Sequence, residues 1–364
     1  MLCMILVSCT GQKTGKENDN NDKIAIEVGE IKFPPQDVLQ LKSYYLSSSV
    51  HVDSIDYLIG YNYRLHSLDC MNLKSKSVTQ IVLPGDGPDA IVRLSGIYAQ
   101  SLDSVWISDE SERAFLIDSV GTIKRMIDLK KYLEDQEQLL INTNYAMFTS
   151  HLFYNASRHS LMFLVKHTPS NTFIVKEVFI DEVGKMATYQ LSSSKVVPDM
   201  SKGYAYINFP NVNFVGENIV YNYPVESSIY MLDIRTNERK YILADSHYTS
   251  NIIEKCTTSG DYATLEKHWL ENSHFYDIMY LPKYKIYARL HADKVDFDEK
   301  KGMEKLINER DLYLMLFDEN MEKIGETKLS NCRYSPFTSW NATYGGIAPV
   351  SYTHLRAHET RGNL

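Results

Sequence analysis

The sequence contains few cysteines and none of the common short motifs for metal, nucleotide or nucleophile sites. Its five cysteines include no pair at the CxxC spacing of a zinc or redox site. It has no GxxxxGK[ST] phosphate loop, no HExxH zinc motif and no GxSxG nucleophile elbow. It also lacks a dense Lys/Arg cluster, and its formal net charge of −8 argues against nucleic acid as a partner. We therefore predict no catalytic residue, no cofactor and no metal ion.

The cysteines do not form a disulfide pattern. Cys3 and Cys9 lie in an N-terminal apolar run, and the three others are far apart and odd in number. We interpret Cys70, Cys256 and Cys332 as structural thiols.

Tyrosine is unusually frequent, at 26 residues, in a chain that is 44% hydrophobic and 23% charged. Tyrosine suits a half-buried pleated surface, so its abundance indicates a large proportion of β-sheet. A sharper alternative is that some of these rings form a stacking surface for sugars. The sequence alone leaves both readings open.

The first nine residues are apolar and end in Ser8 and Cys9, after which the sequence turns abruptly polar. Leu6-Val7-Ser8-Cys9 resembles the lipobox of bacterial lipoproteins, in which the cysteine is acylated and becomes the new N-terminus. The resemblance implies lipidation of Cys9 and a protein tethered to the cell envelope, with the outer membrane as the expected location. The leader is short and lacks a positively charged start, and the alternative is a chance apolar start of a cytosolic protein. Residues 10–23 contain nothing that can be buried and read as a flexible tether.

The C-terminal residues 350–364 match nothing around them in composition or period. They resemble a translated sequencing-adaptor fragment, and we exclude them from reasoning about the fold. His354 and His358 stand four residues apart, but on this interpretation they are not a metal site. If the interpretation holds, the natural chain continues past about residue 350.

A repeated phrase runs through residues 50–330: an apolar run, an Asp, a short turn and an alternating strand. Each copy predicts a β-hairpin, because apolar β-formers supply the strands while Asp with Gly or Asn supplies the turn. The repeated aspartates are Asp69, Asp118, Asp181, Asp233 and Asp318. One or two further strands precede each hairpin, so each unit has three to four strands. Four-stranded units of roughly 40–50 residues are typical of propeller blades.

We therefore predict an all-β protein, a six-bladed β-propeller whose last blade is truncated. Five units are legible, and residues 335–340 resemble the opening of a sixth. Residues 23–33 alternate well and could be an N-terminal strand that closes the ring, with a gap or frayed edge at the truncated blade. Helical stretches are expected at 129–140 and 262–271, and an exposed excursion with a short helix at 293–311.

The predicted domain boundaries follow from these patterns. They are a signal segment at 1–9, a tether at 10–23, the propeller at 24–349 and a non-native tail at 350–364. The lipobox, the tether, the Gly85-Asp86-Gly87-Pro88 turn and the repeats resemble a family of uncharacterised, six-bladed-propeller-like lipoproteins of Gram-negative gut-type bacteria. The resemblance spans roughly 9–345, and it implies the fold and the location but no catalytic residues.

Three patterns could carry chemistry, and for each a structural role is the better interpretation. The glycines at 85–88 suit a turn between blades, because the loop lacks the phosphate-binding pattern. His151, His159 and His167 surround one strand without a carboxylate to complete a zinc site. The repeated aspartates could line a channel, but at hairpin corners they accept backbone N–H groups.

Two classes of function remain. The first is a non-enzymatic binding or scaffold lipoprotein for a protein or glycan partner, with the membrane contacted through the lipid anchor. It predicts an exposed aromatic patch, with Tyr204, Tyr206, Tyr221 and Tyr223 as candidates. The alternative is a hydrolase or lyase that acts on a glycan or ester at the central channel, for which carboxylates and Asn should converge on the axis.

Overall fold

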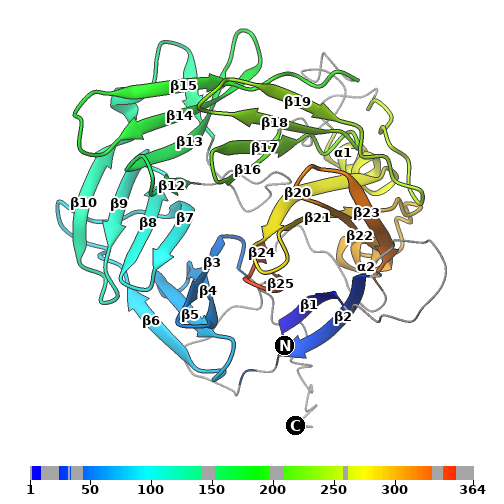
Figure 1. The fold of residues 1–364 in the computed structure, drawn as a ribbon, viewed down its shortest axis with the longest axis horizontal. Coiled ribbons are helices and arrows are strands. Elements are labelled where there is room, and N and C mark those ends of the chain that lie inside the picture. Colours follow the sequence, from blue (N-terminus) through cyan, green and yellow to red (C-terminus); the bar gives the residue numbers. More distant parts are fainter. Residues whose placement is uncertain are drawn as a thin grey trace, which may run out of the picture.

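The protein is a β-propeller in which antiparallel sheets are arranged around a common centre (Figure 1). The computed structural model describes residues 2–9, 24–31, 33, 44–140, 152–196, 209–256, 261–329 and 339–349. Five sheets are built from strands that follow one another in the chain, and we call them blades 1 to 5. A further sheet combines strands from both ends of the chain.

The strands of the five blades have the following bounds. Blade 1 comprises β3 (Ser47–Val52), β4 (Ile55–Asn62), β5 (Ser67–Asn72) and β6 (Val78–Val82). Blade 2 comprises β7 (Leu94–Ser101), β8 (Ser104–Asp109), β9 (Arg113–Ile117) and β10 (Ile123–Asp128). Blade 3 comprises β11 (Glu137–Leu139), β12 (Phe153–Asn155), β13 (Ser160–His167), β14 (Thr172–Phe179) and β15 (Met186–Gln190). Blade 4 comprises β16 (Asn211–Val215), β17 (Asn218–Asn222), β18 (Ile229–Asp233) and β19 (Arg239–Ile242). Blade 5 comprises β20 (His274–Leu281), β21 (Ile286–Ala292), β22 (Leu312–Phe317) and β23 (Lys323–Lys328).

The sheet that closes the ring has the order β2-β1-β25-β24. Its strands are β1 (Leu2–Cys9), β2 (Ile24–Ile31), β24 (Trp340–Ala342) and β25 (Gly346–Pro349). The predicted strand at 23–33 is confirmed as β2, but the N-terminal strand that pairs with the C-terminal β25 is β1. β1 pairs with β2 along its whole length but with β25 at only two positions, Ile5↔Ile347 and Leu6↔Gly346. This arrangement is compatible with the predicted six-bladed ring whose last blade is incomplete.

The predicted hairpins are confirmed as the last two strands of each blade, and the turn role of the aspartates holds at three of them. Asp118, Asp233 and Asp318 each follow or end a strand and accept two backbone N–H groups of the turn. The turn role is wrong for Asp69, which lies fully buried within β5. Its carboxylate accepts hydrogen bonds from Tyr44 at 2.5 Å and from Gln80 at 2.8 Å, so it ties neighbouring strands together.

Two of the three predicted helical segments are confirmed. They are α1 (Tyr262–Leu270), capped by Asp261, and α2 (Met303–Glu309) within the excursion between β21 and β22. The expected helix at 129–140 is wrong beyond the single 3₁₀ turn η1 (Leu129–Tyr132). The residues after it form β11, because pairing with β13 satisfies their backbone and the Glu137 carboxylate lies 2.6 Å from the buried Lys176 ammonium.

The first strands of blades 1, 2, 4 and 5 and β12 of blade 3 lie nearest the middle of the ring (Figure 1). Short polar side chains on these inner strands bond to the next inner strand. The Asn341 amide donates to the Ser47 hydroxyl at 2.6 Å, and the Ser49 hydroxyl donates to the Ala342 carbonyl. On the other side of β3, the Ala99 N–H donates to the Ser48 hydroxyl at 3.0 Å. One run of serines thus connects blade 1 to both of its neighbours.

These bonds predict the effect of breaking one of them. We expect Asn341→Ala to lower the free energy of unfolding by about 1–2 kcal/mol, because the Ser47 hydroxyl loses a partner in a buried setting. Chemical denaturation followed by tryptophan fluorescence measures the change. Ser75→Ala, on an exposed hairpin of blade 1, is the matched control and should leave stability within about 0.5 kcal/mol. Equal effects of the two substitutions would contradict the proposed role of the inner-strand bonds.

Candidate binding site

An exposed tyrosine, Tyr248, projects from the connection between blades 4 and 5. The loop 243–252 follows β19 and precedes α1, and 54% of Tyr248 is accessible to solvent. Two exposed apolar residues, Leu243 at 71% and Ile252 at 50%, come from the same loop. In an antiparallel blade the connection to the next blade and the turn between second and third strands share one end. Loop 243–252 and the excursion that carries α2 therefore lie on the same face of the ring, which we call the loop face.

Beneath Tyr248 a row of stacked rings crosses blade 5. The rings of Tyr248 and Tyr313 have centroids 5.0 Å apart and planes inclined by 19°. Tyr313 stacks on His291 at 5.1 Å, and His291 stacks on Phe275 at 5.4 Å. The last three residues are direct cross-strand neighbours on β22, β21 and β20, so the sheet register itself aligns them. Tyr248 is thus the outermost ring of a stack that begins in the core.

A buried His–Glu pair fastens the loop to this sheet. His291 Nε2 lies 3.0 Å from Glu326 Oε1, and His291 Nδ1 lies 3.1 Å from the Thr249 hydroxyl. The Ser246 hydroxyl and the His247 N–H donate to the same carboxylate at 2.6 and 3.0 Å. Ser246, His247 and Thr249 therefore contact Glu326 or His291, which fixes the loop on either side of Tyr248.

The loop also closes on itself. The Ser246 hydroxyl accepts the Tyr248 N–H at 2.9 Å and the Thr249 N–H at 3.1 Å. The Ser246 N–H donates to the Asn251 side chain at 2.7 Å, and the Asn251 carbonyl accepts the Ser227 N–H at 2.9 Å. These bonds satisfy backbone groups that an irregular loop would otherwise leave to water. Tyr248 therefore stands on a backbone that is already ordered.

A fully buried arginine supports the base of the loop. Arg289 donates to the Ala244 carbonyl at 2.9 Å and to the Ser227 carbonyl, and its guanidinium lies 4.7 Å from the Phe275 ring centroid. These carbonyls belong to two different connections on the loop face, so one side chain joins them. Burial lowers the pKa of Arg289 to about 9, which still leaves it charged at neutral pH.

Electrostatics fix the proton positions in the His–Glu pair. Burial raises the pKa of Glu326, but hydrogen bonds from His291, Ser246, the His247 N–H and Lys323 outweigh burial and lower it to about 2. Burial lowers the pKa of His291, so the imidazole is neutral beside an ionised carboxylate at neutral pH. A neutral imidazole donates at one nitrogen only, so we assign the proton to Nε2, facing Glu326. Nδ1 then accepts the Thr249 hydroxyl.

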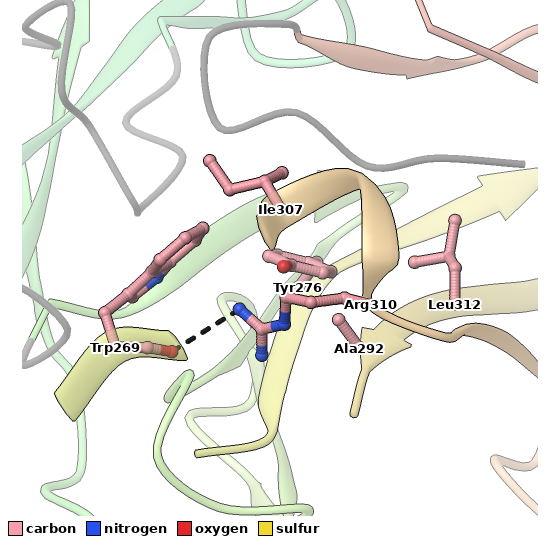
Figure 2. Close-up of a pocket in the computed structure, with 6 residues that line it drawn as sticks. All are labelled: Trp269, Tyr276, Ala292, Ile307, Arg310 and Leu312. Carbon is pink, nitrogen blue, oxygen red and sulfur yellow. Dashed lines mark hydrogen bonds between the residues drawn. The ribbon is translucent and has the colours of Figure 1, made fainter. Parts of the chain in front are cut away.

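A second crevice, between α1 and α2, is filled by its own side chains (Figure 2). The side chains that line it leave no room for a water molecule. They are Trp269, Tyr276, Ala292, Ile307, Arg310 and Leu312. Figure 2 shows the Arg310 guanidinium beside the Trp269 carbonyl. The same guanidinium also donates to the Asp293 and Asn272 carbonyls at 2.6 and 2.7 Å. Arg310 thus ties the end of α1 to the α2 excursion, and this crevice supports the fold.

The described tyrosines that were predicted to form an exposed aromatic patch do not form one. Tyr221 and Tyr223 are buried in the core of blade 4, so that part of the prediction is wrong, and Tyr204 and Tyr206 fall outside the described residues. Sequence reasoning missed Tyr248, because its partners are distant in the chain. Thr249 is 42 residues from His291, and Ser246 is 80 residues from Glu326. No local pattern signals such a contact.

The other patterns singled out in the sequence are not assembled into a site. His159 and His167 flank opposite ends of β13, and His151 lies outside the described residues. The described residues contain no group of three or more His, Cys, Asp or Glu that could hold a metal ion. The loop at 85–88 joins blades 1 and 2, with Gly87 at a φ of 90° as the turn prediction requires. Cys70 and Cys256 are buried free thiols, Cys332 is outside the described residues, and lipidation of Cys9 stays a prediction.

The described inner strands do not gather the carboxylates that the enzyme hypothesis requires at the axis. Within the described ranges the inner strands and β11 contribute only Glu137 and Asp277. Glu137 already pairs with Lys176, and the inner-strand Asn211 and Asn213 donate to backbone carbonyls of β20. The described part of the axis is therefore used for joining blades.

The Glu326 network predicts a pH dependence of stability. Because the folded-state pKa of about 2 lies below the ordinary value of 4.5, the stabilisation is fully present above pH 4.5 and is lost as the pH falls toward 2. Glu326→Gln should melt at a lower temperature than the parent chain at pH 7, and the difference should narrow below pH 4.5. Thermal unfolding followed by circular dichroism across this range measures both curves. A difference that is constant with pH would contradict the assignment of an ionised Glu326.

Among solved structures, this chain is similar to a member of the duf4221 family from Bacteroides vulgatus. The two are 15% identical with a TM-score of 0.65, and the match covers 82% of this chain and 84% of that chain. A putative exported protein from Bacteroides fragilis is 13% identical, with a TM-score of 0.48 and coverage of 82% and 74%. The extracellular domain of a putative one-component system from B. thetaiotaomicron is 9% identical, with a TM-score of 0.42 and coverage of 92% and 38%. The likeness to the duf4221 member concerns the fold.

A search of the curated proteins found no match. In the part of the chain that the structure describes, no helix has the length and apolar character needed to span a membrane. The model of the family described as "Domain of unknown function (DUF4221)" matches residues 17–328, which is most of the chain. The protein therefore belongs to the DUF4221 family.

Proposed function

We propose that the protein is a binding module of the cell envelope that captures a glycan by stacking a sugar ring on Tyr248. The observation that supports this function is an exposed tyrosine held by a stack of rings and a buried ionic network. One face of the Tyr248 ring lies against Tyr313 at 5.0 Å, while more than half of the residue is exposed to solvent. A flat aromatic surface of this kind suits the apolar face of a pyranose.

Preorganisation favours a binding role over a purely structural one. A tyrosine whose loop is already ordered loses little conformational freedom when a ligand arrives, so more of the contact energy becomes affinity. Burying the His291–Glu326 pair and Arg289 costs desolvation free energy, and a loop that only connects two blades does not need such groups. Their shared effect is to fix the position of Tyr248.

Polar groups beside the ring supply the hydrogen bonds that a sugar requires. The Asp311 carboxylate and the Lys328 ammonium form an exposed pair at 2.6 Å, and Lys328 is the cross-strand neighbour of Tyr313. Thr249 adds a hydroxyl next to Tyr248 in the chain. Stacking on an aromatic ring together with carboxylate and ammonium partners gives both affinity and orientation.

The location that we propose rests on the lipobox pattern at Leu6-Val7-Ser8-Cys9. Cleavage before Cys9 would remove Leu2–Ser8, which pair with β2 and β25 in the closing sheet. Processing and the pairing of β1 therefore exclude each other for those residues. The lipid-anchored chain would lose residues 2–8 of β1, the strand through which β2 joins the rest of the closing sheet.

Substituting Tyr248 tests the proposed glycan contact. A glycan array followed by calorimetry on the best neutral ligand should show that Tyr248→Ala weakens binding at least about tenfold, because the stacking surface is lost. Tyr248→Phe keeps the ring and should stay within about threefold. Tyr63→Ala removes an exposed tyrosine in blade 1 and is the matched control. Retained affinity in Tyr248→Ala, or no glycan bound by the parent chain, would contradict the proposal.

Metabolic labelling tests the proposed anchor. Cells that express the full chain and receive an alkyne-tagged fatty acid should incorporate the label into the parent protein, and Cys9→Ala should abolish it. Cys3→Ala is the control, since Cys3 precedes the expected cleavage point. Unchanged labelling in Cys9→Ala would rule out the anchor at this residue without bearing on Tyr248.

A further inference from the structure

A second group of exposed polar and aromatic side chains lies near the axis, on the face opposite to the loop face. It comes from three hairpins that each follow an inner strand: β3–β4, β20–β21 and β24–β25. Figure 1 places β3, β20 and β24 around the middle of the ring. Hydrogen bonds join the hairpins, because the Lys283 N–H donates to the Tyr344 carbonyl at 3.0 Å and the Tyr344 N–H donates to the Asp56 carboxylate at 3.1 Å. Three neighbouring sheets thus meet at Tyr344.

A stacked imidazole and phenol form the surface of this group. The rings of His51 and Tyr344 have centroids 4.3 Å apart and planes inclined by 18°. Tyr344 is 42% exposed and the His51 side chain 35% exposed. His51 reaches Tyr344 because alternate residues of β3 face the same side, and Ser49 on that side already contacts Ala342.

Asp56 orients the imidazole. His51 Nδ1 lies 2.8 Å from the Asp56 carboxylate, which also accepts the Tyr344 N–H. A carboxylate at one ring nitrogen fixes the ring and leaves the other nitrogen for a ligand. Among the described residues, His51 Nε2 has no hydrogen-bond partner. A ring held in this way presents Nε2 in a fixed direction.

Lys283 supplies a positive charge at the same place. Its ammonium lies 5.0 Å from the Tyr284 ring centroid, and it makes no ion pair with a carboxylate in the described part of the chain. The hydrogen bond with Tyr284 raises the pKa of Lys283, and the nearby Asp56 carboxylate adds to this effect. A Cβ at Gly345 would meet the Lys283 stem at 3.1 Å, so the glycine gives this side chain room across the neighbouring hairpin.

We propose that this axial cluster is a second binding site, which takes an acidic sugar such as a hexuronate. The carboxylate of the ligand pairs with the Lys283 ammonium, and ligand hydroxyls bond to His51 Nε2 and to the Tyr344 phenol. A neutral sugar lacks the group that Lys283 recognises, so the charge of the ligand decides the affinity. The site is independent of Tyr248, because the two lie on opposite faces of the ring.

Calorimetry with matched ligands tests the proposal. The probes are oligomers of galacturonate and glucuronate, with galactose and glucose oligomers of equal length as the neutral comparison. The parent chain should bind at least one acidic oligomer at least about tenfold more tightly than its neutral counterpart, and added salt should reduce the affinity. Equal affinity for acidic and neutral oligomers, or no binding of either acidic oligomer, would overturn the proposal.

Variants locate the binding to this cluster. Lys283→Met keeps the apolar stem and removes the charge, and it should reduce affinity for the acidic oligomer about tenfold or more. Lys285→Met, on the same hairpin, should change it less than about twofold, and Tyr248→Ala on the other face should leave it unchanged. His51→Gln should weaken binding of the acidic oligomer, and its cooperative melting transition should show that the variant is still folded. A fall of equal size in Lys283→Met and Lys285→Met would show a non-specific charge effect and overturn the assignment.

Discussion

The ring depends on hydrogen bonds between the innermost strands of neighbouring sheets. An inner strand has one edge without a strand partner, and unpaired backbone groups near the axis would destabilise the fold. The serine run of β3 bonds to β24 on one side and to β7 on the other, and Asn211 and Asn213 bond from β16 to carbonyls of β20. Short polar side chains suit this position, since they reach a neighbouring backbone without forcing the strands apart. The closing sheet relies on the same contacts, because its two halves share only two residue pairs.

The ring also explains why the two candidate sites lie where they do. Three buried ionisable side chains of blade 5 contact the same loop. Arg289, His291 and Glu326 come from β21 and β23, and each contacts the connection that enters blade 5 from blade 4. Buried ionic groups are weak sources of stability, and their best-attested use is to specify one arrangement over others. The arrangement specified here is an ordered loop with an exposed ring at its tip. The axial cluster uses the hairpins at the opposite ends of the inner strands.

The sequence was informative wherever structure depends on neighbours in the chain. Alternating strands predicted the hairpins of all five blades, although Asp69 of blade 1 is not in the turn, and the alternation at 23–33 predicted β2. Prediction failed where distant residues decide the outcome. Asp69 is buried because Tyr44 and Asn62 satisfy its carboxylate, and residues 137–139 form a strand because β13 lies beside them. Tyr248 lies in a polar stretch of the sequence, while Tyr221 follows Ile219 and Val220, and packing places Tyr221 in the core and leaves Tyr248 exposed.

The central claim is that the loop 243–252 is ordered before any ligand binds, so that Tyr248 is presented in a fixed position. Hydrogen–deuterium exchange of the free protein, resolved to single amides, measures this directly. We predict that the amides of Ser246, Tyr248 and Thr249, which are bonded within the loop, exchange much more slowly than those of the exposed turn at 181–184. Exchange of the three loop amides as fast as that of the exposed turn would contradict the account, because the buried network beneath Tyr248 would then not be holding the loop.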